Sequence, residues 1–563
     1  MGNSEVYAYN AHYLPLLSRI MQQMELPNTI NKAIGKEDSQ ATVDTGTVVA
    51  GLILNILSDS KIRLYLLPRF FEDKPMPLLF PWNPGVKPSE FNDDRAGRAL
   101  DDIYAAGGQM VFSAVSRQGL KLYDIDTKTL HVDTTSKSFY GVYDVGDDPP
   151  IKITRGFSKD HRPDLKQILF GVGTVAEGIP ALGEVMSGNQ SDMKFNGAWI
   201  KNIRQWLEKS EDEFLLYIGD SAAVTSDNLR LFEKYHVDFI SRLPERYSIA
   251  DRLIRRALDM EGWDELGTFS PAKDAASYRA VSMLDTLEGR QYRFVVVYSS
   301  KHDKRKLKAL EAEREKEYKK INKKSVKLSK KEYFCEKDAR QEATKFLDKW
   351  AHSLHKLAYK VVEVEKRLKR NGRGRPSKDA HPPQKELRYK LKIDVELNKD
   401  FYQRRQQQCG IFILITSLRD EIIYPNRGIL EEYKGQQGTE RIFKFIKDPT
   451  WVGAYCLKDP SRIVAFGYLI LMAALVYALL ERQVRRSLEN PKEPPIEGLD
   501  RRKTKKPTSY AIKVILTPIL VARIVDPAGE QYLLASILSE NQKRVLRLAG
   551  FDQSIYYWKS NFH

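Results

Sequence analysis

Hydrophobic residues recur every three or four positions through the first part of the chain, a period typical of amphipathic helices. The pattern is clear in residues 13–35 and 44–60 and continues through residues 93–120. We therefore expect a helical N-terminal domain over residues 1–125.

The pattern changes near residue 127. Residues 129–141 read as a strand, and residues 150–192 read as strand, loop, strand, turn and strand. From there to residue 244, predicted helices alternate with short apolar strands. Strands followed by such an alternation indicate a mixed α/β fold built in layers. We assign residues 126–245 to the first part of an α/β core.

Residues 246–408 are expected to form an insertion in this core. It begins with a predicted hairpin over residues 277–300 that turns at Glu288-Gly289. Residues 301–370 are dense in charge, and we expect an exposed helical arm. Residues 409–487 would form the last part of the core, with a strand at 409–418 followed by helices. The remaining residues, 488–563, open with a proline-rich basic linker and have no predicted role.

One apolar segment, residues 463–481, is long enough to cross a bilayer. A helix buried inside a large domain has the same composition. Because the rest of the chain is polar, we favour the buried helix and expect no membrane partner.

Charge and cysteine content narrow the functional classes. The chain has 91 Lys and Arg against 74 Asp and Glu, a net charge of +17. This surplus favours an anionic partner, most simply a nucleic acid; the alternative is a basic protein that only repels its own copies. The three cysteines are far apart and form no CxxC, which excludes a zinc motif and favours a reducing compartment. Since the N-terminus also lacks a signal pattern, we expect a cytoplasmic protein.

Two carboxylates occupy positions where burial is costly. Asp133 interrupts the apolar strand at 129–141, and Asp220 ends the apolar run at 214–220. A buried charge needs compensation, and a divalent cation shared by the two side chains would supply it. The alternative is that Asp133 caps a turn and Asp220 caps a helix.

A third carboxylate lies on a predicted amphipathic helix at 433–447. Its apolar side can pack on the sheet, while Gly435 and Gly438 weaken its first turns. A carboxylate flanked by lysines suits a metal-bound phosphodiester, although a simple surface helix shows the same pattern. The polar face consists of Tyr433, Gln436, Glu440, Lys444 and Lys447.

In order and setting, Asp133, Asp220 and Glu440 resemble the catalytic residues of DDE transposases with an RNase H-like fold. Residues 433–447 are similar to the signature of the IS4-like insertion-sequence transposases, in which Tyr, Arg, Glu and Lys are separated by two, three and six residues. Tyr433, Glu440 and Lys447 match, whereas Gln436 stands in place of the Arg. Residues 156–171 and 178–192 further resemble the IS1634 branch. The resemblance covers roughly residues 10–485.

The resemblance implies an α/β fold with an RNase H-like catalytic core, a helical N-terminal domain for DNA-end binding or dimerisation, and a mixed helical/β insertion. It implies cleavage at insertion-sequence ends and strand transfer into target DNA, with two Mg²⁺ (or Mn²⁺) ions held by Asp133, Asp220 and Glu440. The expected partners are double-stranded DNA, as transposon ends and target, and a second copy of the chain. The expected location is the bacterial cytoplasm, in association with the nucleoid when DNA is bound.

The residues expected to contact DNA include His161 and Arg162, in a loop that approaches the active site or forms a solvated turn. They also include Tyr433, Gln436, Lys444 and Lys447. Two other functions remain open: a DNA-binding protein that keeps the fold without the chemistry, and a hydrolytic nuclease without strand transfer.

Residues 371–378 contain Arg373-Gly374-Arg375-Pro376, which resembles the core of an AT-hook. Glycine lets the backbone lie deep, proline keeps it extended, and the two arginines can enter a narrow A·T minor groove. The alternative is a basic turn between the arm and the next strand.

Overall fold

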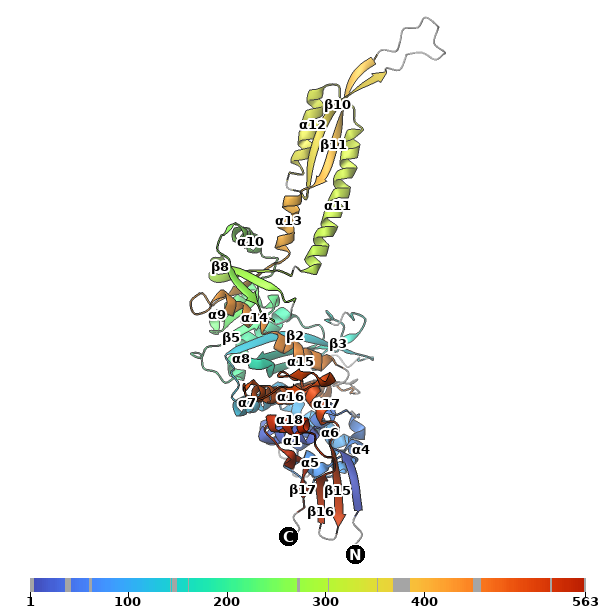
Figure 1. Ribbon diagram of the computed structural model, residues 1–563, viewed down its shortest axis with the longest axis vertical. Helices are drawn as coiled ribbons and strands as arrows, with labels where there is room; N and C mark the ends of the chain where they lie inside the picture. Colours follow the sequence, from blue (N-terminus) through green and yellow to red (C-terminus); the bar gives the residue numbers. More distant parts are fainter. Residues whose placement is uncertain are drawn as a thin grey trace, which may run out of the picture. The chain divides into compact units, whose positions relative to one another are not determined.

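The computed structural model describes residues 5–35, 42–59, 63–141, 143, 149–159, 162–270, 274–301, 303–351, 353–367, 385–448, 457–526 and 529–560. The chain divides into two compact units (Figure 1). Unit 1 comprises Met1–Pro244, Thr286–Arg293 and Ile415–His563, and unit 2 comprises Glu245–Asp285 and Phe294–Leu414. Unit 2 thus covers most of the expected insertion.

The N-terminal part of unit 1 is helical, as its hydrophobic period predicts. Helix α3 is buried along its whole length, and the Asp44 side chain caps it by accepting from the Thr47 N–H. The helices are α1 (Leu14–Gln23), α2 (Leu26–Ile34), α3 (Thr45–Leu57), α4 (Leu67–Glu72), α5 (Met76–Leu79), α6 (Asp93–Ala105) and α7 (Gly108–Leu122).

Helix α16 (Pro460–Glu489) is the central helix of unit 1 and contacts α1, α3, α6 and α7. It contains the long apolar segment seen in the sequence. Within the described residues it is the one helix long and apolar enough to span a membrane, but 83% of its most apolar window is buried. Its hydrophobic surface is therefore covered by protein, as expected for a core helix.

A sheet in unit 1 has the strand order β4-β3-β2-β5-β6. Strands β2, β3 and β4 pair antiparallel, whereas β5 and β6 run parallel to β2. The residue bounds are β2 (Thr129–Phe139), β3 (Lys166–Val175), β4 (Ile179–Ser187), β5 (Leu216–Gly219) and β6 (Asp238–Arg242).

Helices cover both faces of this sheet. Helix α8 (Asp192–Trp206) packs on one face, where a Cβ on Gly171 would lie 2.2 Å from the Phe195 ring. On the opposite face, α16 packs on β4 and α15 (Gln437–Lys447) packs on β2. Helix α9 (Ser226–Lys234) joins β5 to β6.

One predicted strand is absent from the described residues. The stretch that begins at residue 150 forms only an isolated bridge, from Thr154 to Gln167. The reason is that it crosses the ends of two strands: the Gly188 N–H, just after β4, donates to the Lys152 carbonyl. Its backbone therefore contacts two strand ends and follows neither.

After unit 2, the chain returns to unit 1 at Ile415. The last residues of β12 (Ile411–Thr416) lie beside β6, since Thr416 Oγ1 donates to the Phe239 carbonyl over 2.7 Å. Helix α14 (Asn426–Lys434) leads to α15 and α16. The other elements are β13 (Ile496–Glu497), β14 (Lys503–Thr504), α17 (Ser509–Leu516), β15 (Leu520–Asp526), β16 (Gly529–Leu534), α18 (Glu540–Leu548) and β17 (Trp558–Lys559).

Strand β1 (Glu5–Asn10) pairs antiparallel with β15, in a sheet of order β1-β15-β16-β17. The first and last described strands of the chain, β1 and β17, thus belong to one sheet (Figure 1). The N-terminal helices and the C-terminal region therefore share a sheet and a core helix, although the sequence suggested two separate parts.

Unit 2 contains the predicted arm and most of the predicted hairpin, whose turn, Thr286–Arg293, belongs to unit 1. The hairpin of β8 and β9 turns at Glu288 and Gly289, both with positive φ, which confirms the predicted turn. The elements are α10 (Ile249–Asp259), β7 (Asp264–Thr268), β8 (Ser277–Leu287), β9 (Arg290–Ser299), α11 (Lys304–Ser329), α12 (Glu336–Asp348), β10 (His355–Arg367), β11 (Lys385–Leu397) and α13 (Lys399–Gln408).

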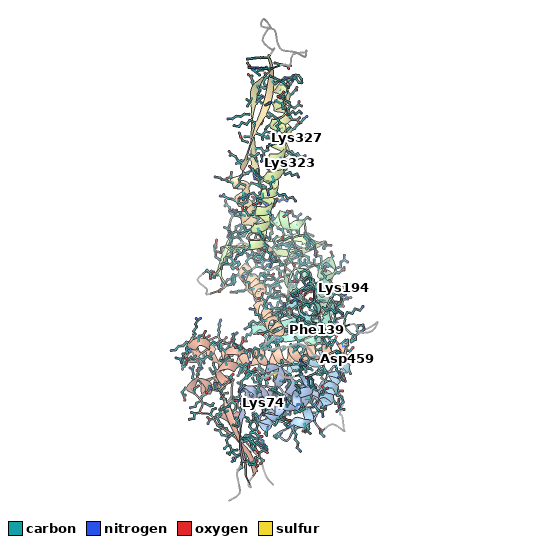
Figure 2. The ribbon with its side chains drawn as sticks, turned by 90° about the vertical axis from the view of Figure 1, so that its right-hand side faces the viewer. Lys74, Phe139, Lys194, Lys323, Lys327 and Asp459 are labelled. Atoms are coloured by element: carbon teal, nitrogen blue, oxygen red, sulfur yellow. The ribbon has the colours of Figure 1, made fainter. Side chains whose placement is uncertain are left out.

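The arm is helical only in part. Helices α11 and α12 form, and lysines such as Lys323 and Lys327 lie exposed on α11 (Figure 2). The expected helix at 355–367 is wrong, because these residues form β10, paired antiparallel with β11. The side chains of Tyr359 and Val361 pack on the cluster around Tyr333. Their alternation with charged residues is a strand pattern that the high charge density concealed.

Candidate active site

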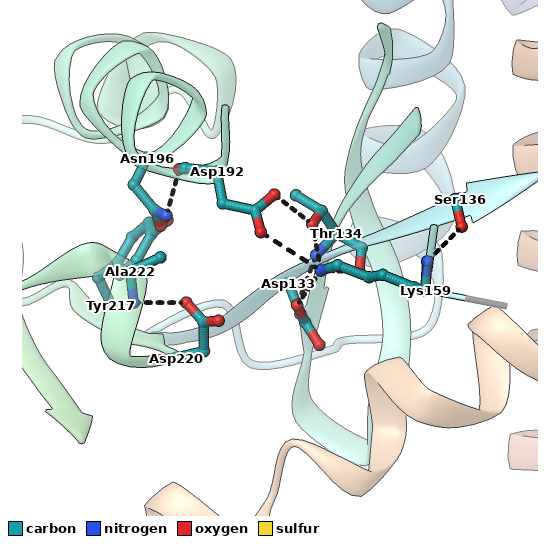
Figure 3. Close-up of polar contacts among 9 residues, drawn as sticks. All are labelled: Asp133, Thr134, Ser136, Lys159, Asp192, Asn196, Tyr217, Asp220 and Ala222. Carbon is teal, nitrogen blue, oxygen red and sulfur yellow. Dashed lines mark hydrogen bonds and ion pairs between the residues drawn. The ribbon is translucent and has the colours of Figure 1, made fainter. Parts of the chain in front are cut away.

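Asp133 and Asp220 lie at the same level on neighbouring strands. Parallel strands β2 and β5 pair with His131 opposite Ile218, and each aspartate follows its member of that pair by two residues. Asp220 keeps an extended backbone, so the alternation of side chains continues past the end of β5. Neighbouring strands are about 4.8 Å apart. The register therefore brings both carboxylates to one place on the sheet (Figure 3).

The surroundings compensate the charge of Asp133 only in part. The pKa of Asp133 rises to about 6, because burial raises it more than the charge of Lys159 lowers it, and the charge of Asp220 adds to the rise. The Thr134 N–H donates to Asp133 Oδ1 over 2.7 Å. Asp133 thus retains an electrostatic cost that an added cation would relieve.

Asp220 shows the same imbalance. Burial raises the pKa of Asp220, the hydrogen bond from the Ala222 N–H lowers it, and the charge of Asp192 raises it. The Ala222 N–H lies 3.0 Å from Asp220 Oδ1, a capping contact of the kind expected for an aspartate after a strand. The capping alternative for Asp220 is therefore part of its role, but it does not neutralise the carboxylate.

Lys159 and Asp192 belong to this cluster, although the sequence analysis did not select either of them. Lys159 Nζ lies 3.5 Å from Asp133 Oδ1 and 3.6 Å from Asp192 Oδ2. Thr134 Oγ1 donates to Asp192 Oδ1 over 2.7 Å. Asp192 opens helix α8, where an acidic residue is expected for helix stability alone. Lys159 lies in the same loop as His161 and Arg162, and only its distance to Asp133 and Asp192 in the fold identifies it as a site residue.

His161 and Arg162 are the two loop residues that were predicted to approach the active site or to form a solvated turn. His161 lies outside the described residues. Arg162 forms a two-bond pair with Asp164, at 2.9 and 2.7 Å, and 47% of its side chain is exposed. Arg162 therefore lies in a solvated turn, which was the stated alternative to an approach to the active site.

Tyr433, at the end of α14, is close enough to the two aspartates for their charges to act on it. Burial raises the pKa of Tyr433, the charge of Arg242 lowers it, and the charges of Asp220 and Asp133 raise it. The structure thus joins the first residue of the predicted signature to the carboxylate pair. This proximity links strands β2 and β5 with a segment more than 200 residues later in the chain.

Glu440 lies on α15, whose helix packs on β2, and its side chain is exposed. It borders a cleft of about 870 Å³ that is also lined by His131, Lys434, Arg441 and Lys444. Across the described ranges, no three His, Cys, Asp or Glu side chains form a group that could hold a metal ion. The structure therefore brings Asp133 and Asp220 together but does not add Glu440 to them.

Close backbone packing fixes α15 on the sheet. A Cβ on Gly435 would lie 2.6 Å from His131 Cε1, and a Cβ on Gly438 would lie 2.5 Å from the Gly178 Cα. The two glycines that weaken the helix thus permit this contact. The hydroxyls of Thr439 and Thr174 hydrogen-bond over 2.7 Å in the buried interface.

The end of α15 is held by a cation. Lys137 Nζ, from β2, donates to the Ile446 carbonyl over 3.1 Å, as suits the negative end of a helix. Arg441 Nη2 donates to the Glu177 carbonyl, and its Nη1 pairs with Glu481 of α16 at 2.9 Å. The helix that carries Glu440 is therefore anchored along its length.

The remaining predicted DNA-contacting residues fall into three groups. Lys444 is exposed in the cleft, and Lys447 is partly exposed at the end of α15. Gln436 has a buried Nε2 without a hydrogen-bond partner among the described residues. Arg373 and Arg375 lie outside the described residues.

His131 faces this helix from β2 and was not predicted as a site residue. Burial lowers the pKa of His131 to about 4, so the ring is neutral at pH 7. Its Nδ1 is buried without a hydrogen-bond partner within the described part of the chain. In the sequence it is one polar residue of a strand, and no local pattern distinguishes it.

Residues 7–117 match the family described as "Domain of unknown function (DUF4277)". No curated protein matches the chain. Similar solved structures include the cryo-EM structure of a piggyBac transposase synaptic complex with hairpin DNA, at 9% sequence identity. That similarity covers 83% of this chain and 75% of the other, with a TM-score of 0.34, too low to support an argument.

Proposed function

We propose that this chain is a DNA transposase that cleaves the ends of an insertion sequence and joins them to target DNA. The observation that carries the proposal is the placement of Asp133 and Asp220 at one level on adjacent parallel strands. The charges of both aspartates also act on Tyr433, the first residue of the resembled signature.

The sheet supports the finer proposal of an RNase H-like core. Three antiparallel strands, β4, β3 and β2, are followed by the parallel strands β5 and β6. In chain order the carboxylates lie on the first of these strands, β2, and directly after the fourth, β5. Open α/β sheets place functional groups at such strand ends.

The carboxylate pair fits a divalent cation such as Mg²⁺ or Mn²⁺. Both side chains offer oxygen donors, and the raised pKa of each carboxyl marks a charge that its protein neighbours leave partly uncompensated. In the proposed DDE mechanism, Asp133, Asp220 and Glu440 would hold two ions. Bound ions would activate the attacking oxygen and stabilise the leaving oxygen of the phosphodiester.

The chain's own residues would bind and orient the DNA. Lys444 and Lys447 supply positive charge for phosphates on the helix that carries Glu440, and Tyr433 offers a hydroxyl and a ring beside the carboxylates. Gln436 has a buried amide nitrogen with no partner among the described residues, in the place where the resembled signature has a phosphate-binding Arg. The match of Tyr433, Glu440 and Lys447 supports assignment to the IS4-like group, and residues 156–171 and 178–192 support its IS1634 branch.

The proposed partners are two transposon ends, target DNA and a second copy of the chain, in a bacterial cytoplasm. The net charge of +17 suits a DNA partner. The alternatives are an inactive DNA-binding protein and a purely hydrolytic nuclease. The carboxylate pair argues against the first, because an inactive protein has no need of two partly compensated charges.

A strand-transfer assay tests the proposal against both alternatives. The full chain is incubated with Mg²⁺ or Mn²⁺, a plasmid target, and labelled duplexes carrying the inverted repeats that flank its coding sequence. Label joined to the plasmid supports a transposase. Nicked ends without joining would indicate the nuclease, and bound but intact ends would indicate the inactive protein.

A further inference from the structure

Lys159 occupies a central place between two carboxylates of the site. Its Nζ lies 3.5 Å from Asp133 Oδ1 and 3.6 Å from Asp192 Oδ2, and 25% of the lysine side chain is exposed (Figure 3). The cluster therefore already contains one cation, supplied by the loop before β3.

The short contacts of this ammonium are made to neutral groups. Lys159 Nζ donates to the Thr134 carbonyl over 2.7 Å and to Thr134 Oγ1 over 2.5 Å. The main chain of the lysine is also fixed, since its N–H donates to Ser136 Oγ over 3.1 Å. Charge-assisted bonds to carboxylates are usually about 2.7–2.9 Å long, so the two carboxylate distances are long. Thr134 holds the ammonium in place, and the carboxylates contribute mainly through charge.

In this arrangement the Lys159 ammonium occupies the region that a metal ion bound to Asp133 would need. A divalent cation bound to Asp133 would lie about 2 Å from a carboxylate oxygen and therefore close to a positive charge. Like charges at such a distance repel strongly in a partly buried site. The ammonium and the metal ion thus compete for the same negative charge.

We propose that Lys159 is an internal counter-ion for the metal-free site and that a divalent cation must displace its ammonium from Asp133 and Asp192 to bind. The inference rests on the proposed function, because it takes Asp133 as a metal ligand. In the free protein Lys159 partly compensates the charge of the carboxylates and weakens metal binding. A lysine that only braced the fold would have the opposite effect, because its loss would loosen the site.

Binding of Mn²⁺ to the DNA-free full chain, measured from the electron paramagnetic resonance signal of the free ion, tests the sign of this effect. Two variants remove the charge: Lys159→Met, and Lys159→Gln, whose amide can still donate to the Thr134 carbonyl. Lys201→Met is the matched control, because Lys201 is an exposed lysine of α8 and carries the same charge. Thermal unfolding shows that each variant is folded.

We expect both Lys159 variants to bind Mn²⁺ roughly tenfold more tightly than the wild type, since removal of a like charge about 4 Å away is worth at least that factor. Lys201→Met should leave the affinity unchanged. Unchanged or weaker binding in both Lys159 variants would overturn the proposal, and so would equal tightening in Lys201→Met.

Asp133→Asn separates failure of this inference from failure of the proposed function. Loss of the Mn²⁺ site in Asp133→Asn places the ion at the carboxylate. If Asp133→Asn binds Mn²⁺ as well as the wild type does, or if no form of the protein binds it, then the metal site of the proposed function is itself wrong, and the role of Lys159 falls with it.

Discussion

Gly438 of α15 packs against Gly178 so closely that a Cβ on Gly438 would lie 2.5 Å from the Gly178 Cα. Backbone atoms cannot move aside as a flexible side chain can. The contact holds α15, and Glu440 with it, against the end of β3.

Gly438→Ala should therefore destabilise unit 1, although alanine favours helices. We expect a loss of roughly 1–3 kcal/mol, the usual cost of overpacking a tight interface. Gly428→Ala on α14 is the matched control, because its Cβ would meet only Pro425 atoms at 3.8 Å. That change should leave stability equal or higher by about 0.5–1 kcal/mol. Urea unfolding of both variants measures the difference, and equal stabilities would contradict the packing described.

Asp133→Asn should stabilise the metal-free protein at neutral pH. The pKa of Asp133 rises from its ordinary 3.8 to about 6 on folding, so the folded state binds the proton more tightly than the unfolded chain. The carboxyl therefore costs stability increasingly as the pH rises from about 4 to about 6. With allowance for solvent screening, we expect a gain of about 1–2 kcal/mol at pH 7 and little gain at pH 4.

Urea unfolding in EDTA at both pH values tests this expectation. Asp212→Asn, at an exposed loop position, is the control and should change stability equally at both. A stability loss for Asp133→Asn at pH 7 would show that the attraction between Asp133 and Lys159 outweighs the burial cost.

Lys447→Ala and Tyr433→Phe should keep Mn²⁺ binding but slow cleavage of a pre-bound end. Loss of a charge-assisted phosphate contact costs about 1.5–3 kcal/mol, or roughly ten- to a hundredfold in rate, so the lysine change should be the larger. Gln436→Arg, which restores the resembled signature, should retain activity. Single-turnover cleavage at saturating Mg²⁺ measures all three. A wild-type rate for Lys447→Ala would mean that this end of α15 does not contact the DNA.

Replacement of Arg373 and Arg375 by Ala should lower the salt dependence of DNA binding. Each lost ionic contact reduces the slope of log K against log salt by about 0.9, so the double variant should lose between one and two units. Fluorescence anisotropy across a salt series gives the slope. Replacement of Lys323 and Lys327, exposed on α11, by Ala removes the same charge and serves as the comparison. An unchanged slope in the Arg373/Arg375 variant alone would exclude residues 371–378 from the interface.

The sequence predicted the structure correctly where a single physical effect determines the local conformation. The turn at Glu288-Gly289 was predictable because few residues accept positive φ, and the burial of α16 was predictable from its apolar length. Strand β10 was missed, because charged residues alternate there with apolar ones and a high charge density suggests an exposed helix. These residues form a strand because β10 pairs with β11 and packs on α12, and both are tertiary contacts that the local sequence does not show.

Only part of the candidate site could be predicted from the sequence. Asp133 and Asp220 could be identified because a carboxylate in an apolar strand is unusual. Lys159 and Asp192 could not, because a lysine in a polar loop and an aspartate at a helix start are common. The sequence also could not tell that Gly435 and Gly438 serve packing, since close backbone approach depends on what the helix meets.

The measurement that tests the central claim most directly is cleavage of a labelled inverted-repeat end by Asp133→Asn, Asp220→Asn and Glu440→Gln, with end binding measured on the same preparations. If the three carboxylates form one site, each change abolishes cleavage in Mg²⁺ and leaves end binding nearly intact. Full cleavage by either aspartate variant would contradict the account. Full cleavage by Glu440→Gln would leave the pair on β2 and β5 as the site and remove α15 from the chemistry.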